Sequence, residues 1–297
     1  MEQQVRKRPA LFRALGKDDP PAEVTIRGVP YRREAIYKHD SWAATSVYIN
    51  DAGERAICKF NRRQPVFIVP MGWLGRALAA REAAFLNRLA DTGCVPEDLG
   101  PVSANGRMLP YAMARVFIEG VAFRSPDQVD EAFFEALRDG LTRIHEHDVA
   151  YVDLHKRENI LIAADGRPVF LDFQVSYGLR KSWLGGGPVS RYVLRQLQEL
   201  DDYHYLKHVS KCCPDMIPDA DRYLQRTGLV RLHRRIARPF KYLRKKLLIG
   251  LRIRDASGRV ETELEPEIAF RREGRAAGPE RDDSGIGSSD RPTAGAA

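Results

Sequence analysis

Three polar side chains beside apolar runs are of the types that phosphoryl transfer uses. Asp153 and Asn159 flank a polar loop in the middle of the chain, and Asp172 ends the strand-like run 169–171. A buried carboxylate costs free energy unless a cation compensates it, and Mg²⁺ prefers the oxygens of carboxylates and amides. The pattern therefore predicts a carboxylate that acts as a base, Asp153, and two Mg²⁺ ligands, Asn159 and Asp172.

A β-hairpin is the element expected to bring the two metal ligands together. The runs 160–162 and 169–171 are short and apolar, and Asp165-Gly166 between them is a turn sequence. Asn159 and Asp172 lie just outside these runs, so the hairpin would present them near each other. A helix is expected before the loop, because a Ser-Pro helix start is followed by apolar residues at helical spacing: Phe133, Leu137, Leu141 and Ile144.

The N-terminal part of the chain favours a small antiparallel sheet. Strand-like runs separated by turn residues form an expected meander, at residues 24–26, 35–37, 45–49 and 55–60. Residues 109–117 are expected to add a strand, and residues 118–120 an exit from the sheet that suits a hinge. A later helical segment, 189–209, has apolar residues roughly on one side.

Lys59 lies inside the fourth of these runs, between Cys58 and Phe60. It could extend to solvent from a half-buried strand. However, Glu82 lies on the apolar stripe of the next predicted helix, which is formed by Leu78, Phe85, Leu86 and Leu89. A glutamate on such a stripe requires a cation, and Lys59 is the nearest candidate in sequence order, so we expect the two to pair.

The composition is that of an ordinary soluble protein and gives no sign of export. The chain has 297 residues, of which 43% are hydrophobic and 30% are charged. Its longest uncharged run, residues 64–75, is too short to span a bilayer. Four cysteines have no metal-binding spacing, which favours a reducing compartment. The expected location is the cytoplasm.

The positive charge is concentrated in one segment. Residues 223–254 contain eleven Lys/Arg and no Asp/Glu, and removing these charges from the net +8 leaves −3 for the rest of the chain. Apolar residues in this segment recur at helical spacing, which predicts a basic amphipathic helix over residues 229–250. Residues 1–20 are expected to form a flexible basic arm, and residues 271–297 a disordered tail.

Taken in order, these motifs resemble the protein-kinase-like superfamily over residues 30–210. The bacterial lipopolysaccharide core-sugar (Kdo and heptose) kinases and the RIO-type atypical kinases are the most similar members. The resemblance implies an α+β fold of two lobes. A small antiparallel N-lobe sheet with one key helix would occupy residues 21–117, and a shortened, mainly helical C-lobe residues 118–254.

The same resemblance implies ATP and Mg²⁺ as cofactors and assigns a role to each matching residue. Asp153 would take the proton of the acceptor hydroxyl, and His155 would touch the γ-phosphate. Lys59, positioned by Glu82, would contact the α- and β-phosphates. Asn159 and Asp172 would hold Mg²⁺, and the strand that leads to the hinge would meet the nucleotide through Arg115 and Phe117.

The sequence departs from the kinase pattern in several places. Five residues instead of four separate Asp153 from Asn159, so the loop must bulge by one residue. Tyr151 replaces the usual histidine, and Gln174 replaces the glycine after Asp-Phe. Residues 38–44 replace a Gly-rich phosphate loop, so Ser41, Thr45 or neighbouring backbone N–H groups would have to serve. No Ala-Pro-Glu segment follows, so control through an activation loop is not expected.

Three functions agree with these motifs. In the first, the acceptor is a sugar hydroxyl of a lipopolysaccharide-type glycolipid, and residues 229–250 hold the enzyme at the anionic inner face of the membrane, since each Lys/Arg there contributes roughly 1 kcal/mol. In the second, the acceptor is a protein serine or threonine, as in RIO-type kinases. In the third, the fold is an inactive binding module. Few aromatic residues interleave with the basic ones, so no nucleic acid is expected. The oligomeric state is not predicted.

Overall fold

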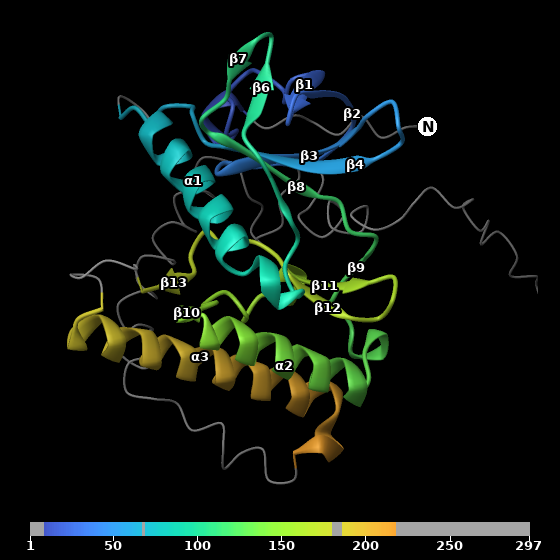
Figure 1. Cartoon of the computed structure of the whole chain (residues 1–297), viewed down its shortest axis with the longest axis vertical. Helices are drawn as coiled ribbons and strands as arrows, with labels where there is room; N and C mark the ends of the chain where they lie inside the picture. The colour runs from blue at the N-terminus through green and yellow to red at the C-terminus, as the bar shows by residue number, and fades with distance from the viewer. Residues whose placement is uncertain (1–8, 67–68, 180–185, 218–297) are drawn as a thin grey trace, which may run out of the picture.

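Eight strands form one antiparallel sheet in the computed structural model, which describes residues 9–66, 69–179 and 186–217. The order across the sheet is β5-β8-β4-β3-β2-β1-β6-β7 (Figure 1). The strands are β1 Glu23–Ile26, β2 Val29–His39, β3 Ala43–Ile49, β4 Arg55–Asn61, β5 Asp98–Gly100, β6 Val102–Ala104, β7 Arg107–Met108 and β8 Ala112–Val116. The predicted meander is confirmed, because β1 to β4 pair with one another in chain order.

One long helix, α1 (Gly72–Arg88), runs from this sheet towards the second lobe (Figure 1). Its sequence is rich in Ala, Leu and Arg, which favour the helix. The buried face contains Ala79, Glu82, Phe85 and Leu86. The helix therefore carries one acid among apolar residues, as the stripe predicted.

The second lobe is built on two long helices that lie side by side, α2 (Glu131–Glu146) and α3 (Pro188–Cys212) (Figure 1). The described part of this lobe also contains a two-stranded sheet, β10-β13, and a three-stranded sheet, β12-β11-β9. Their strands are β9 Gly120–Ala122, β10 Val149–Ala150, β11 Ile160–Ala163, β12 Pro168–Phe170 and β13 Tyr177–Gly178. β11 and β12 form the predicted hairpin, with Ile160 opposite Phe170. The Asp130 side chain caps α2 by accepting a hydrogen bond from the Phe133 N–H.

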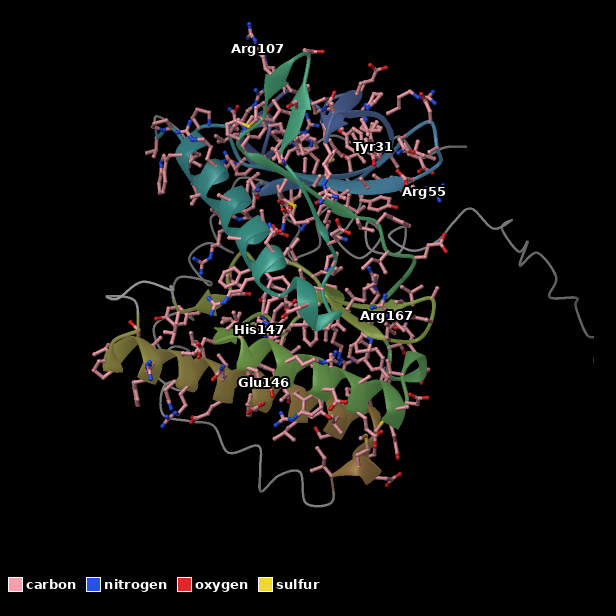
Figure 2. All side chains as sticks on the ribbon, in the orientation of Figure 1. Tyr31, Arg55, Arg107, Glu146, His147 and Arg167 are labelled. Carbon is pink, nitrogen blue, oxygen red and sulfur yellow. The ribbon has the colours of Figure 1, made fainter. Side chains whose placement is uncertain are left out.

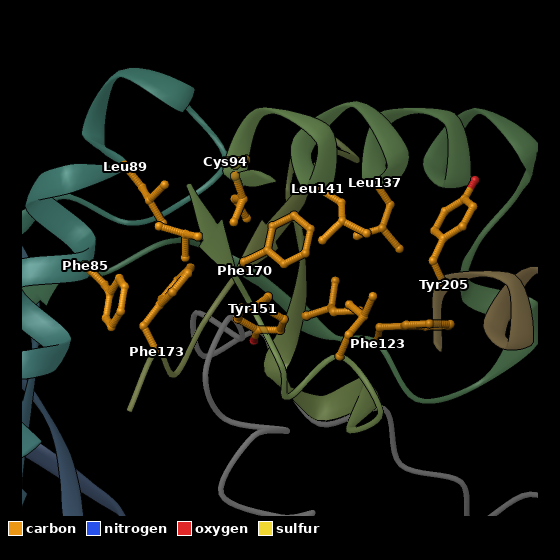
Figure 3. Packing of buried hydrophobic residues seen from close by; sticks show 14 of the residues in the cluster. Phe85, Leu89, Cys94, Phe123, Leu137, Leu141, Tyr151, Phe170, Phe173 and Tyr205 are labelled. Atoms are coloured by element: carbon orange, nitrogen blue, oxygen red, sulfur yellow. The ribbon is translucent and has the colours of Figure 1, made fainter. Parts of the chain in front are cut away.

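A single hydrophobic cluster runs through both lobes. It joins Phe85 and Leu89 at the end of α1 to Phe173, and continues through Tyr151 to the buried face of α2 (Figure 3). The rings of Tyr151 and Phe173 meet nearly edge to face, with centroids 5.1 Å apart. The segments that contain Asp153 and Asp172 are thus anchored in the same core.

Three sequence expectations need correction. Residues 9–20 pack on the sheet instead of forming a flexible arm, since Arg13 is only 4% exposed and its guanidinium lies 2.8 Å from the His39 ring. The strand expected over residues 109–117 begins at Ala112, because residues 109–111 form a turn after β7. Ser125 caps a short 3-10 turn, Pro126–Gln128, and not the long helix.

The predicted segments 229–250 and 271–297 lie outside the described residues, as do residues 1–8. Within the described ranges, no helix has both the length and the apolar character needed to cross a membrane. Figure 2 shows Arg107 pointing outward at the tip of the β6–β7 hairpin, on the side of the sheet away from α2 and α3. The two-lobed α+β architecture expected from the sequence is present in the described residues: an antiparallel sheet with one long helix is followed by a mainly helical lobe.

Candidate active site

Lys59 joins the two lobes through two carboxylates. Its ammonium lies 2.9 Å from Glu82 Oε2 on α1 and 3.0 Å from Asp172 Oδ1, which follows β12. The Glu82 side chain is 3% exposed and that of Lys59 is 13% exposed. Asp172 is different, because 37% of its side chain remains exposed. The predicted Lys59–Glu82 pair is present, and Asp172 is the member of the group that solvent can reach.

The charges of this group favour an ionised Asp172. Burial opposes the charge of Lys59, but Asp172 and Glu82 outweigh it and raise the pKa of the ammonium. Burial also opposes ionisation of Asp172, yet Lys59 and two further lysines, Lys38 and Lys156, lower the pKa of its carboxyl. At Glu82, burial raises the pKa and Lys59 only partly offsets it. Asp172 is therefore the stronger candidate for holding a cation.

Side chains of its own loop surround the Asp153 carboxylate and donate hydrogen bonds to it. The Asn159 amide nitrogen donates to Asp153 Oδ2 at 2.8 Å, and the Lys156 ammonium donates to the same oxygen at 2.6 Å. The other oxygen, Oδ1, lies 3.2 Å from His155 Nδ1. Asp153 is 4% exposed. Because the charge of Lys156 also acts on Asp172, the two predicted carboxylates converge on one region.

The side chain of Asp201 on α3 accepts hydrogen bonds from the backbone directly before Asp153. The two oxygens of this fully buried carboxylate accept the N–H groups of Tyr151 and Val152, each at 2.7 Å. Val152 has a φ of +71°, which is unfavourable for a β-branched residue and costs roughly 1–3 kcal/mol. The carboxylate of Asp201 therefore stabilises a strained peptide directly before the predicted base.

Tyr151 occupies the position of the usual histidine and has a clear structural role. Its hydroxyl donates to the carbonyl oxygen of Leu171, the residue before Asp172. Asp172 itself has a φ of +59°, a conformation that aspartate tolerates better than most residues. The Tyr151 ring packs on Phe173, so the side chain fixes the backbone on both sides of Asp172.

The segment after Asp172 is tied to the small lobe. Gln174, which stands where a glycine was expected, donates from its amide to Asn61 Oδ1 at 2.6 Å. Arg81 of α1 donates to the carbonyl oxygens of Gln174 and Ser176. The loop between Asp153 and Asn159, which is one residue longer than the kinase pattern, ends in a 3-10 turn at Arg157–Asn159. Both departures from the kinase pattern thus have local structural solutions.

The remaining predicted residues lie in different surroundings. Ser41 is in the turn between β2 and β3, and its hydroxyl donates to the Phe12 carbonyl at 3.0 Å. Arg115 is buried on β8, and its charge acts on Glu82. Phe117 packs against an apolar cluster of the sheet that contains Ile57. Their roles towards a nucleotide stay predictions.

Two residues of this region were not found from the sequence. Asp201 lies in a polar stretch of α3. Lys156 follows His155 directly, and the loop conformation decides which of the two approaches Asp153 most closely. A buried acid opposite the loop could have been suspected only from the helical phase of Leu194, Asp201 and Tyr205, which all lie on the buried side of α3.

The donor set fits a hard divalent cation. Asp172 offers an accessible carboxylate, and the nitrogen of Asn159 donates to Asp153, which leaves the amide oxygen as its acceptor. Oxygen ligands of this kind suit Mg²⁺. No family model and no curated protein matches the chain.

Among solved structures, two of the Rio2 kinase from Chaetomium thermophilum are similar to this chain. One is described as an ADP/Mg²⁺-phosphoaspartate complex, with a TM-score of 0.44, 16% identity, and coverage of 66% of this chain and 62% of that chain. The other has a TM-score of 0.43, 16% identity, and coverage of 63% and 61%. The chain thus spans about three-fifths of the length of these neighbours.

Proposed function

We propose that the protein is an ATP-dependent kinase that phosphorylates a hydroxyl group. One observation carries the proposal: Lys59 bridges Glu82 and a partly exposed Asp172, beside a loop in which Asn159 and Lys156 orient Asp153. This is the constellation that positions phosphates and a nucleophile in phosphoryl transfer. An ion pair between Lys59 and Glu82 with a purely structural role would not need a further carboxylate nearby. Here Asp153, with its amide partner Asn159, lies beside that pair.

Two apolar clusters on either side of the hinge support a site for the adenine base. Tyr37, Val47 and Ile57 of the sheet form one cluster, against which Phe117 packs. Residues of the β11–β12 hairpin form the other, against which Ile118 packs, and they are Leu161, Ala163, Val169 and Leu171. Ligand sites combine apolar walls with a few polar groups. The backbone of residues 116–119 would supply the polar groups at the base.

The residues of the chain divide the chemistry as follows. The acceptor oxygen forms a bond to the γ-phosphorus, the bond between that phosphorus and the β–γ bridging oxygen breaks, and ADP leaves. Asp153 accepts the hydroxyl proton on a carboxylate oxygen. Lys59 neutralises the α- and β-phosphates, and Glu82 fixes the direction of its ammonium. Asn159 and Asp172 would hold Mg²⁺, which supplies positive charge to the phosphate oxygens.

The acceptor is proposed from the sequence. A sugar hydroxyl of a lipopolysaccharide-type glycolipid is the first candidate, with the basic segment 229–250 at an anionic membrane surface. Replacing four charges of that segment by Gln (Lys241, Arg244, Lys245 and Lys246) should then weaken binding to vesicles that contain anionic lipid, and binding equal to that of the wild type would remove the membrane role. A protein serine or threonine is the alternative acceptor.

The decisive experiment is ATP turnover with a panel of acceptors. Core oligosaccharide and a casein-like protein would be offered in parallel, with Asp172→Ala as the inactive control. Transfer of the γ-phosphate to the oligosaccharide supports the sugar acceptor, and transfer to the casein-like protein supports the protein acceptor. If the wild type binds Mg·ATP but labels neither acceptor and releases no ADP, the chain is a binding module and the kinase proposal fails.

A further inference from the structure

A second lysine, Lys38, projects from the same face of the sheet as Lys59. Lys38 of β2 lies opposite Thr45 of β3, and Thr45 lies opposite Lys59 of β4. Directly opposed residues of neighbouring strands point to the same side of a sheet. The three side chains therefore form one polar row across three strands. This is the face from which Lys59 reaches Asp172.

An irregularity in β2 puts Lys38 on this face. Ile36 lies opposite Ser46, but the pairing shifts before the next pair, so that Lys38 and not Tyr37 lies opposite Thr45. In a regular ladder Lys38 would lie opposite Ala44, which faces the apolar core of the small lobe. The extra residue of a β-bulge changes the direction of the side chains that follow. Here it turns one lysine from the core to the site.

The charge and the surroundings of Lys38 agree with this placement. Burial raises the pKa of the Asp172 carboxyl, and the charges of Lys59, Lys38 and Lys156 lower it. The Lys38 ammonium lies 2.7 Å from Asp40 Oδ2, and 28% of its side chain is exposed. An ammonium carries three N–H donors and can therefore serve more than one acceptor. Asp40 is itself fixed by the N–H groups of Trp42 and Ala43.

The order of strands indicates which phosphate Lys38 would meet. The hinge follows β8, and the order from there is β8, β4, β3, β2. The apolar residues Val47 and Ile57 lie opposite each other one step before the polar row on the same face. An adenine ring packed against Val47 and Ile57 would direct its phosphates along the polar row. The phosphates nearer the ribose would then meet Lys59, and the terminal phosphate would meet Lys38. Neighbouring strands are roughly 4.8 Å apart.

We propose that Lys38 binds the γ-phosphate of the nucleotide and so takes over the task of a Gly-rich loop. The turn after β2 contains no glycine between Lys38 and Ala44, and the hydroxyl of Ser41 is donated to Phe12. A side-chain cation from β2 replaces backbone N–H groups in this arrangement. The inference rests on the proposed function, because it requires that ATP is the ligand.

Calorimetric binding of two nucleotides with Mg²⁺ tests the proposal: ADP, and the β,γ-imido analogue of ATP, which carries a γ-phosphate but is not turned over. Lys38→Gln should weaken the analogue about tenfold, the loss typical of one charge-assisted hydrogen bond, and should change ADP binding less than about twofold. The matched control is Arg32→Gln on the same strand, whose side chain is 69% exposed. It should leave both affinities unchanged.

Each other result overturns a defined part of the reasoning. If Lys38→Gln weakens both nucleotides equally, or neither, Lys38 does not bind the γ-phosphate. The double variant Lys38→Gln/Asp40→Asn removes the carboxylate left without its cation. If the double variant again binds the ATP analogue more tightly than ADP, as the wild type does, the unpaired Asp40 caused the weaker binding and the proposal is refuted. If the double variant still binds the analogue weakly, the proposal is supported. A wild type that binds neither nucleotide refutes the proposed function itself.

Discussion

Replacing Asp201 by Asn tests whether its carboxylate fixes the conformation of the loop that contains Asp153. Two N–H groups, those of Tyr151 and Val152, donate to two different oxygens of Asp201. The amide of Asn has a single oxygen, so one of the two donors would face an NH₂ group. The variant loses one charge-assisted hydrogen bond and leaves a buried donor unsatisfied, for an expected destabilisation of about 3 kcal/mol.

The expected change in melting temperature follows from the size of the folded part. A loss of about 3 kcal/mol corresponds to a decrease of roughly 6–12 °C for a domain of about 200 residues. The neighbouring variant Asp202→Asn is the matched control, because Asp202 forms an exposed ion pair with Arg138. Exposed pairs of this kind contribute less than about 1 kcal/mol. Differential scanning calorimetry of both variants gives the comparison.

Activity provides the second measurement for Asp201→Asn. Val152 is held at a positive φ directly before Asp153, so a relaxed peptide would misplace the base more than it would disturb the nucleotide. We therefore expect kcat to fall by roughly 100-fold, with a smaller change in the KM for ATP. A variant that melts like Asp202→Asn and keeps the kcat of the wild type would show that the loop holds its conformation without Asp201.

Three further predictions follow from the site. Lys59→Met should lower kcat/KM by at least about 100-fold and destabilise the fold by about 3 kcal/mol, because it leaves a buried carboxylate without its cation; a melting temperature equal to that of the wild type would contradict the buried ion pair. Asp153→Asn should lower kcat by roughly 10²–10⁴-fold and leave Mg·ADP binding unchanged, and turnover at the rate of the wild type would exclude Asp153 as the base. Burial lowers the pKa of both His204 and His208 to about 4, from about 6.5 in the unfolded chain. Between these values the unfolded chain binds more protons, so stability should decrease as the pH falls, with a slope of up to about 2.7 kcal/mol per pH unit. Urea unfolding at a series of pH values measures this slope. His208→Gln should reduce it by about half, and an unchanged slope would show that His208 is not neutral in the fold.

The parts of the site that could be predicted depend on regular periodicity. Glu82 was found because its phase on an amphipathic helix is readable from its apolar neighbours, and the pairing with Lys59 followed from charge alone. Asn159 and Asp172 were placed together because a hairpin with a clear turn connects them. In each case the elements are regular, so residue spacing translates directly into position.

The residues that were missed depend on irregular or long-range geometry. Lys38 faces the site only because the pairing of β2 shifts by one residue, and the local sequence gives no sign of this bulge. Asp201 acts on a loop about fifty positions away, where the contact is decided by the packing of α3 under β10. The N-terminal segment has the composition of a solvated basic arm, but the Arg13 guanidinium contacts the ring of His39, a partner that only the folded sheet brings near it.

That N-terminal segment also constrains the order in which the small lobe can be completed on the ribosome. Arg13 and Ala14 are translated before their partners, which are His39 and Asp40 in β2 and the adjoining turn, and Arg63 beyond β4. At roughly 5–20 residues per second, a delay of some seconds separates Ala14 from Arg63. Until the meander has emerged, Arg13 and Ala14 therefore lack the partners that hold them in the fold. Arg13 and Ala14 are then expected to dock after the strands that they contact.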